Sequence, residues 1–189
     1  VKYAINAEGT VTESFYNHYG QLERRVTYAH CDNAYLSISE SDLIRDIQQN
    51  RSLLKDREEI MFYDSFDRLE YHIDPEGGVI YYNYDYNDNL IRTIRYKYMI
   101  EDEQREDIKY SSSVYKALDD AAKSANEEDH YRGAHIEHMF YDALGRMIYH
   151  VDAMHYVTKY EYDELNNVKS EYLFKTPLSD DPDANRSLS

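Results

Sequence analysis

The sequence predicts a mainly β protein, an antiparallel sheet of hairpin repeats with two α-helical insertions. Runs of alternating apolar and polar residues recur along the chain and are separated by short turns of Asp, Asn and Gly, as in hairpins. Tyrosine, which suits half-buried strands, occurs 22 times, whereas tryptophan is absent. Two charged segments with apolar residues three and four positions apart interrupt these runs, and this spacing predicts helices.

One segment of the chain recurs without a gap. Residues 62–74 align with residues 140–152, which carries Tyr63 onto Tyr141. An earlier copy begins at residue 6 and aligns with the segment that begins at residue 74, which carries Tyr16 onto Tyr84. Similarity of a chain to itself at fixed spacings is the signature of a repeat protein. We therefore expect the strands to be copies of one hairpin unit.

A shorter period lies within each copy, because Tyr63 and Tyr84 are 21 positions apart, as are Tyr141 and Tyr162. Each unit reads Tyr-Asp or a close variant, then a turn, an apolar residue and an alternating strand. Five units begin at Tyr16, Tyr63, Tyr84, Tyr141 and Tyr162.

The segment from Tyr141 to Met147 reads Tyr-Asp-Ala-Leu-Gly-Arg-Met. It resembles the Tyr-Asp-x-x-Gly-Arg-Leu unit of the YD-repeat, or RHS-repeat, family. The other units depart from that motif, with Asp67, Asp88 and Asn166 where glycine is usual. The resemblance covers about two thirds of the chain, and the family motif contains no catalytic residue. The residues that define the repeat are Tyr16, Tyr63, Asp64, Tyr84, Asp85, Tyr141, Asp142, Gly145, Arg146, Tyr162 and Asp163.

The resemblance implies a ribbon of hairpins that coils into a wall around a chamber. It implies a structural role in a polymorphic toxin or the shell of an insecticidal toxin complex, where the wall isolates a passenger polypeptide. A secreted or cell-surface location, no cofactor and no catalysis follow from the same resemblance. The alternative is an adhesion module, as in teneurin-like surface proteins, that contacts carbohydrate or protein. An enzyme is the least favoured class.

The first part of the chain combines strands with a helix. Residues 1–36 are expected to form the first hairpins, around a turn at residues 17–21 that contains Gly20. Residues 37–59 are expected to form a helical insertion, in which the apolar residues are Leu43, Ile44, Ile47, Leu53 and Leu54. Ser39 or Ser41 is expected to cap its start, and Lys55 and Arg57 to lie near its end.

The remainder follows the same alternation. Residues 60–100 are expected to hold two YD units, and residues 101–135 a second helical insertion. Ser113 is expected to cap that helix, whose apolar residues are Val114, Tyr115, Leu118, Ala121, Ala122 and Ala125. Residues 136–176 hold the last two units, and residues 177–189 are expected to be a disordered polar tail.

Charge and composition exclude several classes. The chain has 21 basic and 37 acidic residues and a formal net charge of −16, which would repel a nucleic-acid backbone. The acidic surplus fits either a solvated surface or an acidic wall that faces a basic partner. A single cysteine, Cys31, allows neither an intrachain disulfide nor a zinc site built from cysteines. No apolar run reaches the roughly 18 residues of a membrane span.

The ends of the predicted sheet indicate its partners. Residues 1–6 match residues 70–74 through a shared Tyr-x-Ile-Asn/Asp pattern, so the chain is expected to be one fragment, residues 1–189, of a longer array. A sheet cut from such an array has bare edges that invite pairing. We expect these edges to pair with the rest of the parent shell or with a second copy of the chain.

Four features suggest sharper chemistry, and each has a plainer interpretation. Zinc could bind a group made of Asp129, His130, His135 and His138. His135 and His138 are three positions apart and could share a helical face, although exposed or turn histidines are favoured. The segment 74–77, Asp-Pro-Glu-Gly, resembles a self-cleavage motif of the family but is aligned with other turns, so a plain turn is favoured. His72 and His150 occupy one repeat position and are expected to have cross-strand neighbours. A tyrosine face could stack on sugars, but the favoured interpretation is that its rings pack the sheet against its helices or its neighbours. The face comprises Tyr81, Tyr82, Tyr84, Tyr86, Tyr96 and Tyr98.

Overall fold

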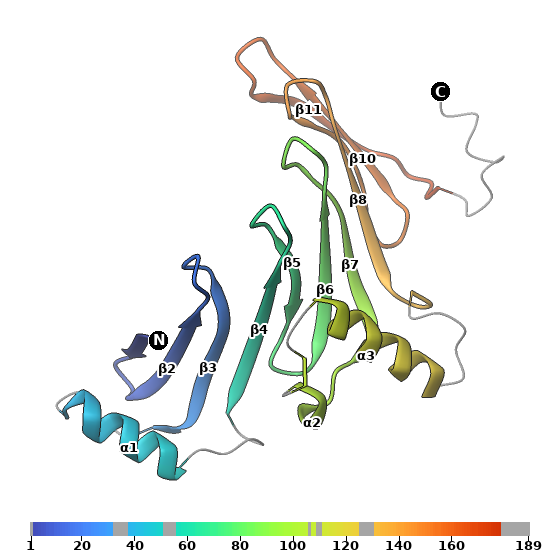
Figure 1. The fold of residues 1–189 in the computed structure, drawn as a ribbon. Helices are drawn as coiled ribbons and strands as arrows, with labels where there is room; N and C mark the ends of the chain where they lie inside the picture. The colour runs from blue at the N-terminus through green and yellow to red at the C-terminus, as the bar shows by residue number, and fades with distance from the viewer. Residues whose placement is uncertain are drawn as a thin grey trace. The chain divides into compact units, whose positions relative to one another are not determined.

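The computed structural model describes residues 2–31, 38–50, 56–105, 107–108, 111–124 and 131–178. The predicted fold class is confirmed, because antiparallel strands dominate these ranges and helices interrupt them twice (Figure 1). The strands are β1 (Lys2–Ile5), β2 (Thr10–Tyr16), β3 (Leu22–Cys31), β4 (Arg57–Tyr63), β5 (Leu69–Ile73), β6 (Gly78–Tyr84), β7 (Leu90–Met99), β8 (His135–Tyr141), β9 (Met147–Val151), β10 (Val157–Tyr162) and β11 (Val168–Leu173).

The order of the strands in the sheet is their order in the sequence. Within the described chain, the sheet has eleven strands that run from β1 to β11 without a crossover. Every hydrogen-bonded pair with a resolved register is antiparallel. The sheet is therefore a succession of hairpins, as the repeat predicts, and each strand pairs with its neighbours in the chain.

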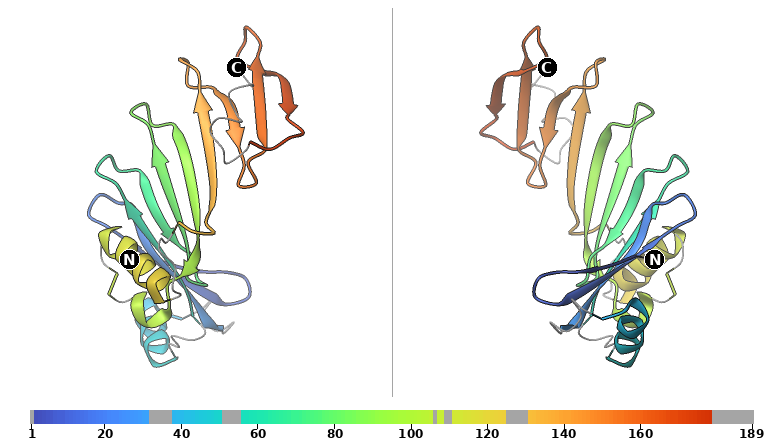
Figure 2. Two further views of the ribbon diagram at one scale, coloured as in Figure 1. Left: turned by 90° about the vertical axis from the view of Figure 1, so that its right-hand side faces the viewer. Right: turned by 90° about the vertical axis from the view of Figure 1, so that its left-hand side faces the viewer.

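The residues group into two compact units. Unit 1 comprises Val1–Val79 with Tyr98–His130, and unit 2 comprises Ile80–Lys97 with Tyr131–Ser189. The helices α1 (Glu40–Asn50), α2 (Asp102–Arg105) and α3 (Ser111–Ser124) all belong to unit 1. Both longer helices, α1 and α3, lie on the same side of the strands of that unit (Figures 1 and 2).

One hydrophobic cluster of unit 1 lies where β2 and β3 meet α1. Val11, Val26 and Tyr28 are buried on β2 and β3, and they pack with Leu43 and Ile47 of α1. Apolar residues three and four apart give α1 one buried stripe, as its sequence predicts. Each such side chain contributes about 1.5–3 kcal/mol when fully buried. The insertion is therefore part of the core, and removing it would expose apolar residues of the strands.

A carboxylate is buried beside this cluster. Glu13 is 9% exposed and accepts hydrogen bonds from the hydroxyls of Tyr3, at 2.8 Å, and Tyr28. Burial and then the Glu13 carboxylate raise the pKa of Tyr3 to about 12, with a further contribution from Glu40. The two phenol hydroxyls replace the water that the Glu13 carboxylate loses on burial, which reduces the free-energy cost of burying it.

The first helix is shorter than the 37–59 segment predicted from the sequence. Ser39 is its cap, because the Ser39 carbonyl accepts from the Leu43 N–H at 3.0 Å and the Ser39 hydroxyl from the Asp42 N–H at 3.3 Å. The helix ends at Asn50, and residues 57–59 belong to β4. Lys55 lies outside the described residues. The predicted helix was too long because the spacing of apolar residues carries no information about the pairing of β4 with β3.

The second insertion contains two helices where one was predicted. The longer, α3, begins at Ser111, so Ser113 lies inside its first turn and is not its cap. Its Val114, Leu118 and Ala122 are almost fully buried, as predicted. The predicted end of the insertion at residue 135 is also corrected, because His135 already pairs with Arg95 of β7. Ala125 and the predicted tail from residue 179 lie outside the described residues.

The short helix α2 is tied to the strands by one arginine. Arg105 is 5% exposed, and its guanidinium donates to the carbonyls of Glu58 and Pro75, both at 2.8 Å. The Ile100 N–H donates to the Gly77 carbonyl at 2.9 Å just before α2 begins. A buried guanidinium needs such acceptors. These contacts fix the start of the second insertion against the turn at residues 74–78.

Candidate functional site

The repeated turns are the most regular feature of the structure. Eight turns of the described chain begin with an Asp or Asn whose side-chain oxygen accepts the N–H groups of the third and fifth residues. The N–H of the first residue also donates to the carbonyl of the fifth, and the N–H of the fourth to the carbonyl of the first. The first residues are Asn6, Asn17, Asp64, Asp74, Asp85, Asp142, Asp152 and Asp163.

The fourth residue of each turn has a positive φ. Glycine fills this position in four turns, and its φ lies between 76° for Gly145 and 90° for Gly77. Asp67, Asp88 and Asn166, which stand where the family has glycine, have φ values of 64°, 63° and 65°. Asp and Asn tolerate this conformation better than other residues with a side chain. The drifted units therefore keep the turn of the intact one.

A plain turn at residues 74–77 is confirmed, because this segment has the same hydrogen bonds as the other seven turns. Sequence reasoning did not single out His155, which occupies the fourth position of the Asp152 turn at a φ of 66°. Its alignment with Gly77 is the signal that could have identified it.

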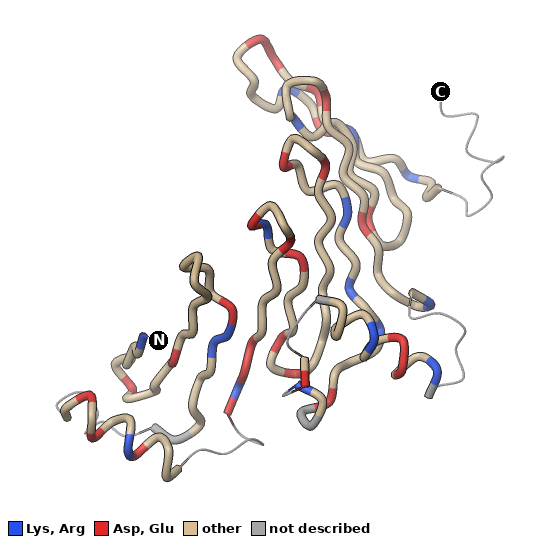
Figure 3. Tube along the Cα trace, in the orientation of Figure 1, with Lys and Arg blue, Asp and Glu red and all other residues tan. Residues whose placement is uncertain are grey.

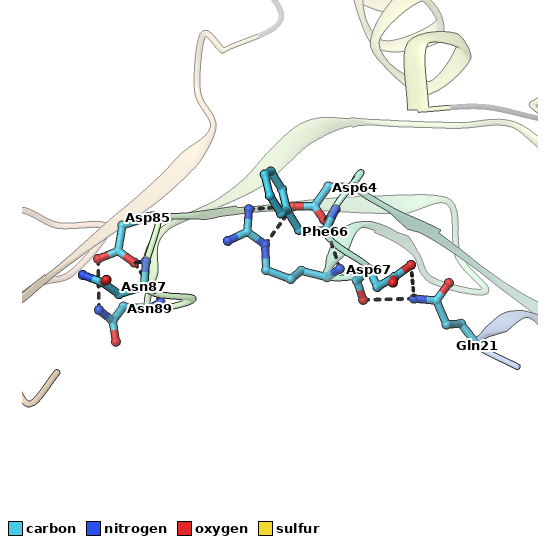
Figure 4. Close-up of polar contacts among 8 residues, drawn as sticks. Gln21, Asp64, Phe66, Asp67, Asp85, Asn87 and Asn89 are labelled. Atoms are coloured by element: carbon cyan, nitrogen blue, oxygen red, sulfur yellow. Dashed lines mark hydrogen bonds and ion pairs between the residues drawn. The ribbon is translucent and has the colours of Figure 1, made fainter. Parts of the chain in front are cut away.

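Five of the turns follow a tyrosine, and in these the fifth residue adds a side-chain contact. Arg68 donates through Nε to Asp64 at 2.9 Å, and Arg146 to Asp142 at 2.8 Å (the turns at Asp64 and Asp85 are drawn in Figure 4). Asn89 and Asn167 donate through Nδ2 to Asp85 and Asp163 in the same way, whereas Gln21 accepts through Oε1 from the Asn17 side-chain amide. The Tyr-Asp-x-x-Gly-Arg motif thus specifies both ends of one hydrogen-bonded turn.

The acidic side chains of these turns have perturbed acidity. Partial burial acts to raise the pKa of Asp64, but hydrogen bonds from the backbone and guanidinium of Arg68 and from the Phe66 N–H outweigh it and lower that pKa. The Arg146 side chain and N–H lower the pKa of Asp142, and the N–H and side chain of Asn167 lower the pKa of Asp163. Hydrogen bonds to the charged form are the common cause. Figure 3 shows how acidic residues gather at the hairpin turns.

The tyrosines of the repeat connect one hairpin to the next. Tyr63, Tyr141 and Tyr162 end β4, β8 and β10. Their hydroxyls donate to the carbonyl of the first residue of the preceding strand, at 2.7–2.9 Å; the acceptors are Leu22, Leu90 and Met147. Tyr16 and Tyr84 hold the same place at the ends of β2 and β6. Burial is the leading cause that raises the pKa of Tyr63 and Tyr141 above the ordinary value.

Within unit 1 and within unit 2, a turn that follows a tyrosine also contacts the next such turn along the chain. The Gln21 amide donates to the Asp67 carbonyl at 2.9 Å, and the Arg146 guanidinium to the Asn166 side chain at 2.8 Å. In both pairs the fifth residue of one turn reaches the fourth residue of the next. Sequence reasoning did not identify these contacts, since they join residues 46 and 20 positions apart.

The histidines show no metal site in the described ranges, where no three His, Cys, Asp or Glu side chains cluster. His135 and His138 lie in β8 on opposite faces, so the helical face suggested for them is wrong. Asp129 and His130 lie outside the described residues. His72 and His150 face Glu59 and Glu137 at 3.9 and 3.2 Å, and their cross-strand neighbours are Met61 and Met139.

The six tyrosines considered for sugar stacking do not form one surface. Tyr81 and Tyr82 are consecutive in β6 and point to opposite faces. Tyr96 is buried with its ring 5.8 Å from that of Tyr131, whereas Tyr86 is fully exposed. A single stacking platform made from these rings is therefore excluded.

Unit 2 contains a groove of about 530 Å³ at the turn end of β6, β7 and β8. Its lining includes Asn83, Asn87, Arg92, His138 and Phe140. Burial, then the charge of Arg92, then that of His155 lower the pKa of His138. Sequence reasoning did not find this groove, because it depends on which residues face one another across strands.

No protein-family model matches the sequence, and no curated protein matches it. Solved structures do resemble its fold. One is the crystal structure of TcdB2-TccC3-Cdc42, with a TM-score of 0.56 and 11% identity over 88% of this chain. A second is the Photorhabdus luminescens Tc holotoxin pore with a mutated TccC3, with a TM-score of 0.55 and the same identity and coverage. A third is the crystal structure of TcdB2-TccC3, with a TM-score of 0.52 and 13% identity over 93% of this chain.

This chain spans only 6% to 8% of the length of the chains it matches. At these identities the likeness shows a shared fold. Among the helices that the structure describes, none is long and apolar enough to cross a membrane.

Proposed function

We propose that this chain is a structural segment in the wall of a large RHS-type toxin or toxin-complex shell. In this proposal the wall encloses a passenger polypeptide, and the chain itself catalyses no reaction. Its partners are the rest of the parent shell, or a second copy at the sheet edges, together with the passenger. The parent protein is secreted or displayed at a cell surface.

The observation that supports this proposal best is that the same tyrosine-to-carbonyl hydrogen bond links successive hairpins at three places. The repeated residues are committed to holding turns and to linking strands, as the Asp142–Arg146 and Tyr141–Leu90 contacts illustrate. Residues used in this way extend a sheet and leave no repeated side chain for chemistry. The likeness to Tc toxin structures over 88% to 93% of the chain adds support at the level of the fold.

The test uses the full-length protein that contains this chain. Electron microscopy of the purified protein should show a closed shell, and a protease should leave an enclosed polypeptide intact until urea opens the shell. A matched sample digested after opening serves as the control. An open fibre, or a passenger that is cut equally before and after urea, would contradict the proposal.

The same experiment separates the competing function, an adhesion module. An adhesion module predicts no protected passenger, and it predicts that the intact protein binds to cells or to immobilised glycans. Binding that survives with no enclosed polypeptide would favour this second function.

A further inference from the structure

The turns that follow a tyrosine share a large apolar side chain at their tip. The residues are Tyr19, Phe66, Tyr86, Leu144 and Leu165, and their exposure runs from 68% for Phe66 to 101% for Tyr86. Each occupies the second or third position of its turn, where the side chain takes no part in the repeated hydrogen bonds. Turns ordinarily carry small or polar residues at such positions. The geometry of the turn therefore does not account for these side chains.

The turns at the other edge of the sheet provide a comparison. Successive turns of an antiparallel sheet alternate between its two edges, so the turns that begin at residues 6, 74 and 152 lie opposite the tyrosine turns of their own unit. At their second and third positions stand Ala7 and Glu8, Pro75 and Glu76, and Ala153 and Met154. Of these residues, Met154 alone is large and apolar. The apolar tips are therefore a property of one edge and not of the turn.

The tyrosine turns of unit 2 follow one another along that edge. They join β6 to β7, β8 to β9 and β10 to β11. Asn89 Oδ1 of the first turn lies 3.6 Å from the position that a Cβ on Gly145 of the second would occupy. The Arg146 guanidinium of the second turn donates to the Asn166 side chain of the third at 2.8 Å. Each turn therefore approaches the next closely through its fifth residue.

Tyr86, Leu144 and Leu165 of these three turns together form what we term the tip row. Neighbouring strands are roughly 4.8 Å apart and each hairpin contributes two strands, so successive members of the row are about 10 Å apart. An α-helix rises about 1.5 Å per residue, so residues seven positions apart are separated by about 10.5 Å. A helix laid along the row can therefore place one apolar residue on each tip.

The turns that carry the tip row are acidic (Figure 3). Residues 85–89, 142–146 and 163–167 include one basic residue, Arg146, which is already paired with Asp142 at 2.7 Å. Their acidic residues are Asp85, Asp88, Asp142, Asp163 and Glu164. A second copy of this chain, with its net charge of −16, would bring like charges together, and an anionic membrane would be repelled in the same way. Charge complementarity therefore selects a cationic partner.

We propose that the tip row binds a basic amphipathic α-helix of a partner polypeptide. Apolar residues of that helix, seven positions apart, contact Tyr86, Leu144 and Leu165, and lysine or arginine residues beside the apolar stripe face the carboxylates of the turns. Exposed apolar side chains arranged in a row and bordered by charge are typical of an interaction surface. The inference goes beyond the wall function, because it uses turn positions at which the repeat specifies no residue.

The first experiment measures binding of a synthetic helix to the whole chain by fluorescence anisotropy. The labelled peptide has about 20 residues, enough to span the row, with one leucine stripe flanked by lysines. One control peptide has the same composition in scrambled order, and a second has glutamate in place of every lysine. We expect a Kd in the micromolar range for the amphipathic peptide, binding at least about tenfold weaker for the scrambled peptide, and none for the glutamate peptide. Equal affinities for the two lysine peptides would overturn the proposal, because charge alone would then drive binding.

The variants compare the two edges of unit 2. The double variant Leu144→Ser, Leu165→Ser should weaken binding of the amphipathic peptide about tenfold or more. Met154→Ser is the matched control, because Met154 is 67% exposed at the third position of a turn on the opposite edge, and it should leave the Kd unchanged. No loss in the double variant, or an equal loss in Met154→Ser, would overturn the site.

A measurement on the unmodified chain removes the dependence on folding of the variants. The methyl resonances of Leu144 and Leu165 should shift when the amphipathic peptide is added, and that of Met154 should stay in place. A titration that moves the Met154 signal and leaves both leucine signals unchanged would also overturn the assignment.

Sedimentation with lipid vesicles separates a polypeptide partner from a lipid surface. We expect the chain to stay in solution with vesicles of phosphatidylcholine, whether or not they contain phosphatidylserine. Sedimentation of the chain with either kind of vesicle, abolished in the double variant, would identify the tip row as a membrane contact and would overturn the proposal.

Discussion

The hydroxyl of Tyr141 donates to the backbone carbonyl of Leu90 at 2.9 Å, and this bond joins residues 51 positions apart in the sequence. Tyr141 closes β8, and Leu90 opens β7, so the bond spans the boundary between two successive hairpins. The same bond recurs from Tyr63 to Leu22 and from Tyr162 to Met147. In three of the five repeats, the tyrosine that marks the repeat in the sequence therefore links its hairpin to the strand before it.

Removing this hydroxyl should weaken the sheet without changing its shape. We expect Tyr141→Phe to lower the free energy of unfolding by about 1 kcal/mol, since the Leu90 carbonyl loses its donor. Urea unfolding followed by near-ultraviolet dichroism measures the change. Tyr86→Phe is the matched control, because Tyr86 is fully exposed, and it should have no effect. Equal losses in both variants would refute the linking role of Tyr141.

The side-chain oxygen of Asp64, which accepts two backbone N–H groups, should contribute more to stability than the charge of its carboxylate. Asp64→Ala removes the acceptor of the Phe66 and Arg68 N–H groups, and we expect a loss of about 1–2 kcal/mol. Asp64→Asn should cost less, because Asn17 makes the same two backbone contacts in its own turn. Thermal or urea unfolding compares the two variants. An Asn variant as unstable as the Ala variant would contradict this interpretation of the turn.

The lowered pKa values of the turn aspartates predict acid sensitivity. The folded-state pKa of Asp64 lies below its unfolded value of about 3.9, so its contribution is complete above that value and is lost as the pH falls through the folded pKa. We therefore expect the slope of unfolding free energy against pH to be shallower in Asp64→Asn than in the parent chain below about pH 4. Identical slopes would show that the carboxylate carries no linkage.

His138 predicts a second dependence at milder pH. Its folded-state pKa is lowered below the unfolded value of about 6.5, so folded protein takes up this proton less readily. The contribution of His138 to stability is complete above about pH 6.5 and is lost as the pH falls through its folded-state pKa. His138→Ile, which installs the residue found at Ile60, should reduce the loss of stability between about pH 7.5 and 5.5. Urea unfolding at the two pH values measures that loss, and an unchanged loss would exclude His138 as its source.

Two glycines with the same backbone conformation should respond differently to a methyl group. Gly77 has a φ of 90°, and an added Cβ would lie 2.3 Å from the Ile100 carbonyl oxygen. Gly20 has a φ of 84°, and nothing lies within 4 Å of its Cβ position. We expect Gly20→Ala to cost about 1–2 kcal/mol through backbone strain alone, and Gly77→Ala to cost more than about 3 kcal/mol. Thermal unfolding of both variants tests the difference, and equal costs would mean that the Ile100 contact yields.

The first helix should behave as part of the core. Leu43 is 4% exposed and packs with Val11 and Val26, so Leu43→Ala should cost about 2–4 kcal/mol. Gln48→Ala on the exposed side of α1 is the control and should change little. Urea unfolding distinguishes them. A negligible cost for Leu43→Ala would instead support an insertion that the strands do not need.

The sequence allowed much of the fold to be predicted, because the features that specify it are local. Alternation defines a strand such as β5, and the pair Asn17 and Gly20 defines a turn within five residues. Tertiary pairing limited the prediction at Glu58, whose charged surroundings fit a helix but whose ion pair with Arg24 belongs to a strand. Side-chain spacing cannot separate these cases without the register.

The contacts that join distant segments were beyond the sequence for the same reason. Nothing near Tyr141 indicates Leu90 as its acceptor, and nothing near Arg92 indicates that His138 lies opposite it. Aligning the copies places Arg24 on Arg92, but the residue opposite each arginine is known only from the registers of β3 with β4 and of β7 with β8. The groove became visible once these neighbours were known.

The eight turns hold their shape through the first and fourth residues, which leaves the side chains between them unconstrained. In the turn at Asp64 these are Ser65 and Phe66, and in the turn at Asp152 they are Ala153 and Met154. A gene that encodes such a chain can therefore gain or lose whole hairpins by in-frame duplication or deletion, since the residues that specify each turn lie within five consecutive positions. The same independence lets the tips diversify quickly under selection while the strands behind them stay fixed.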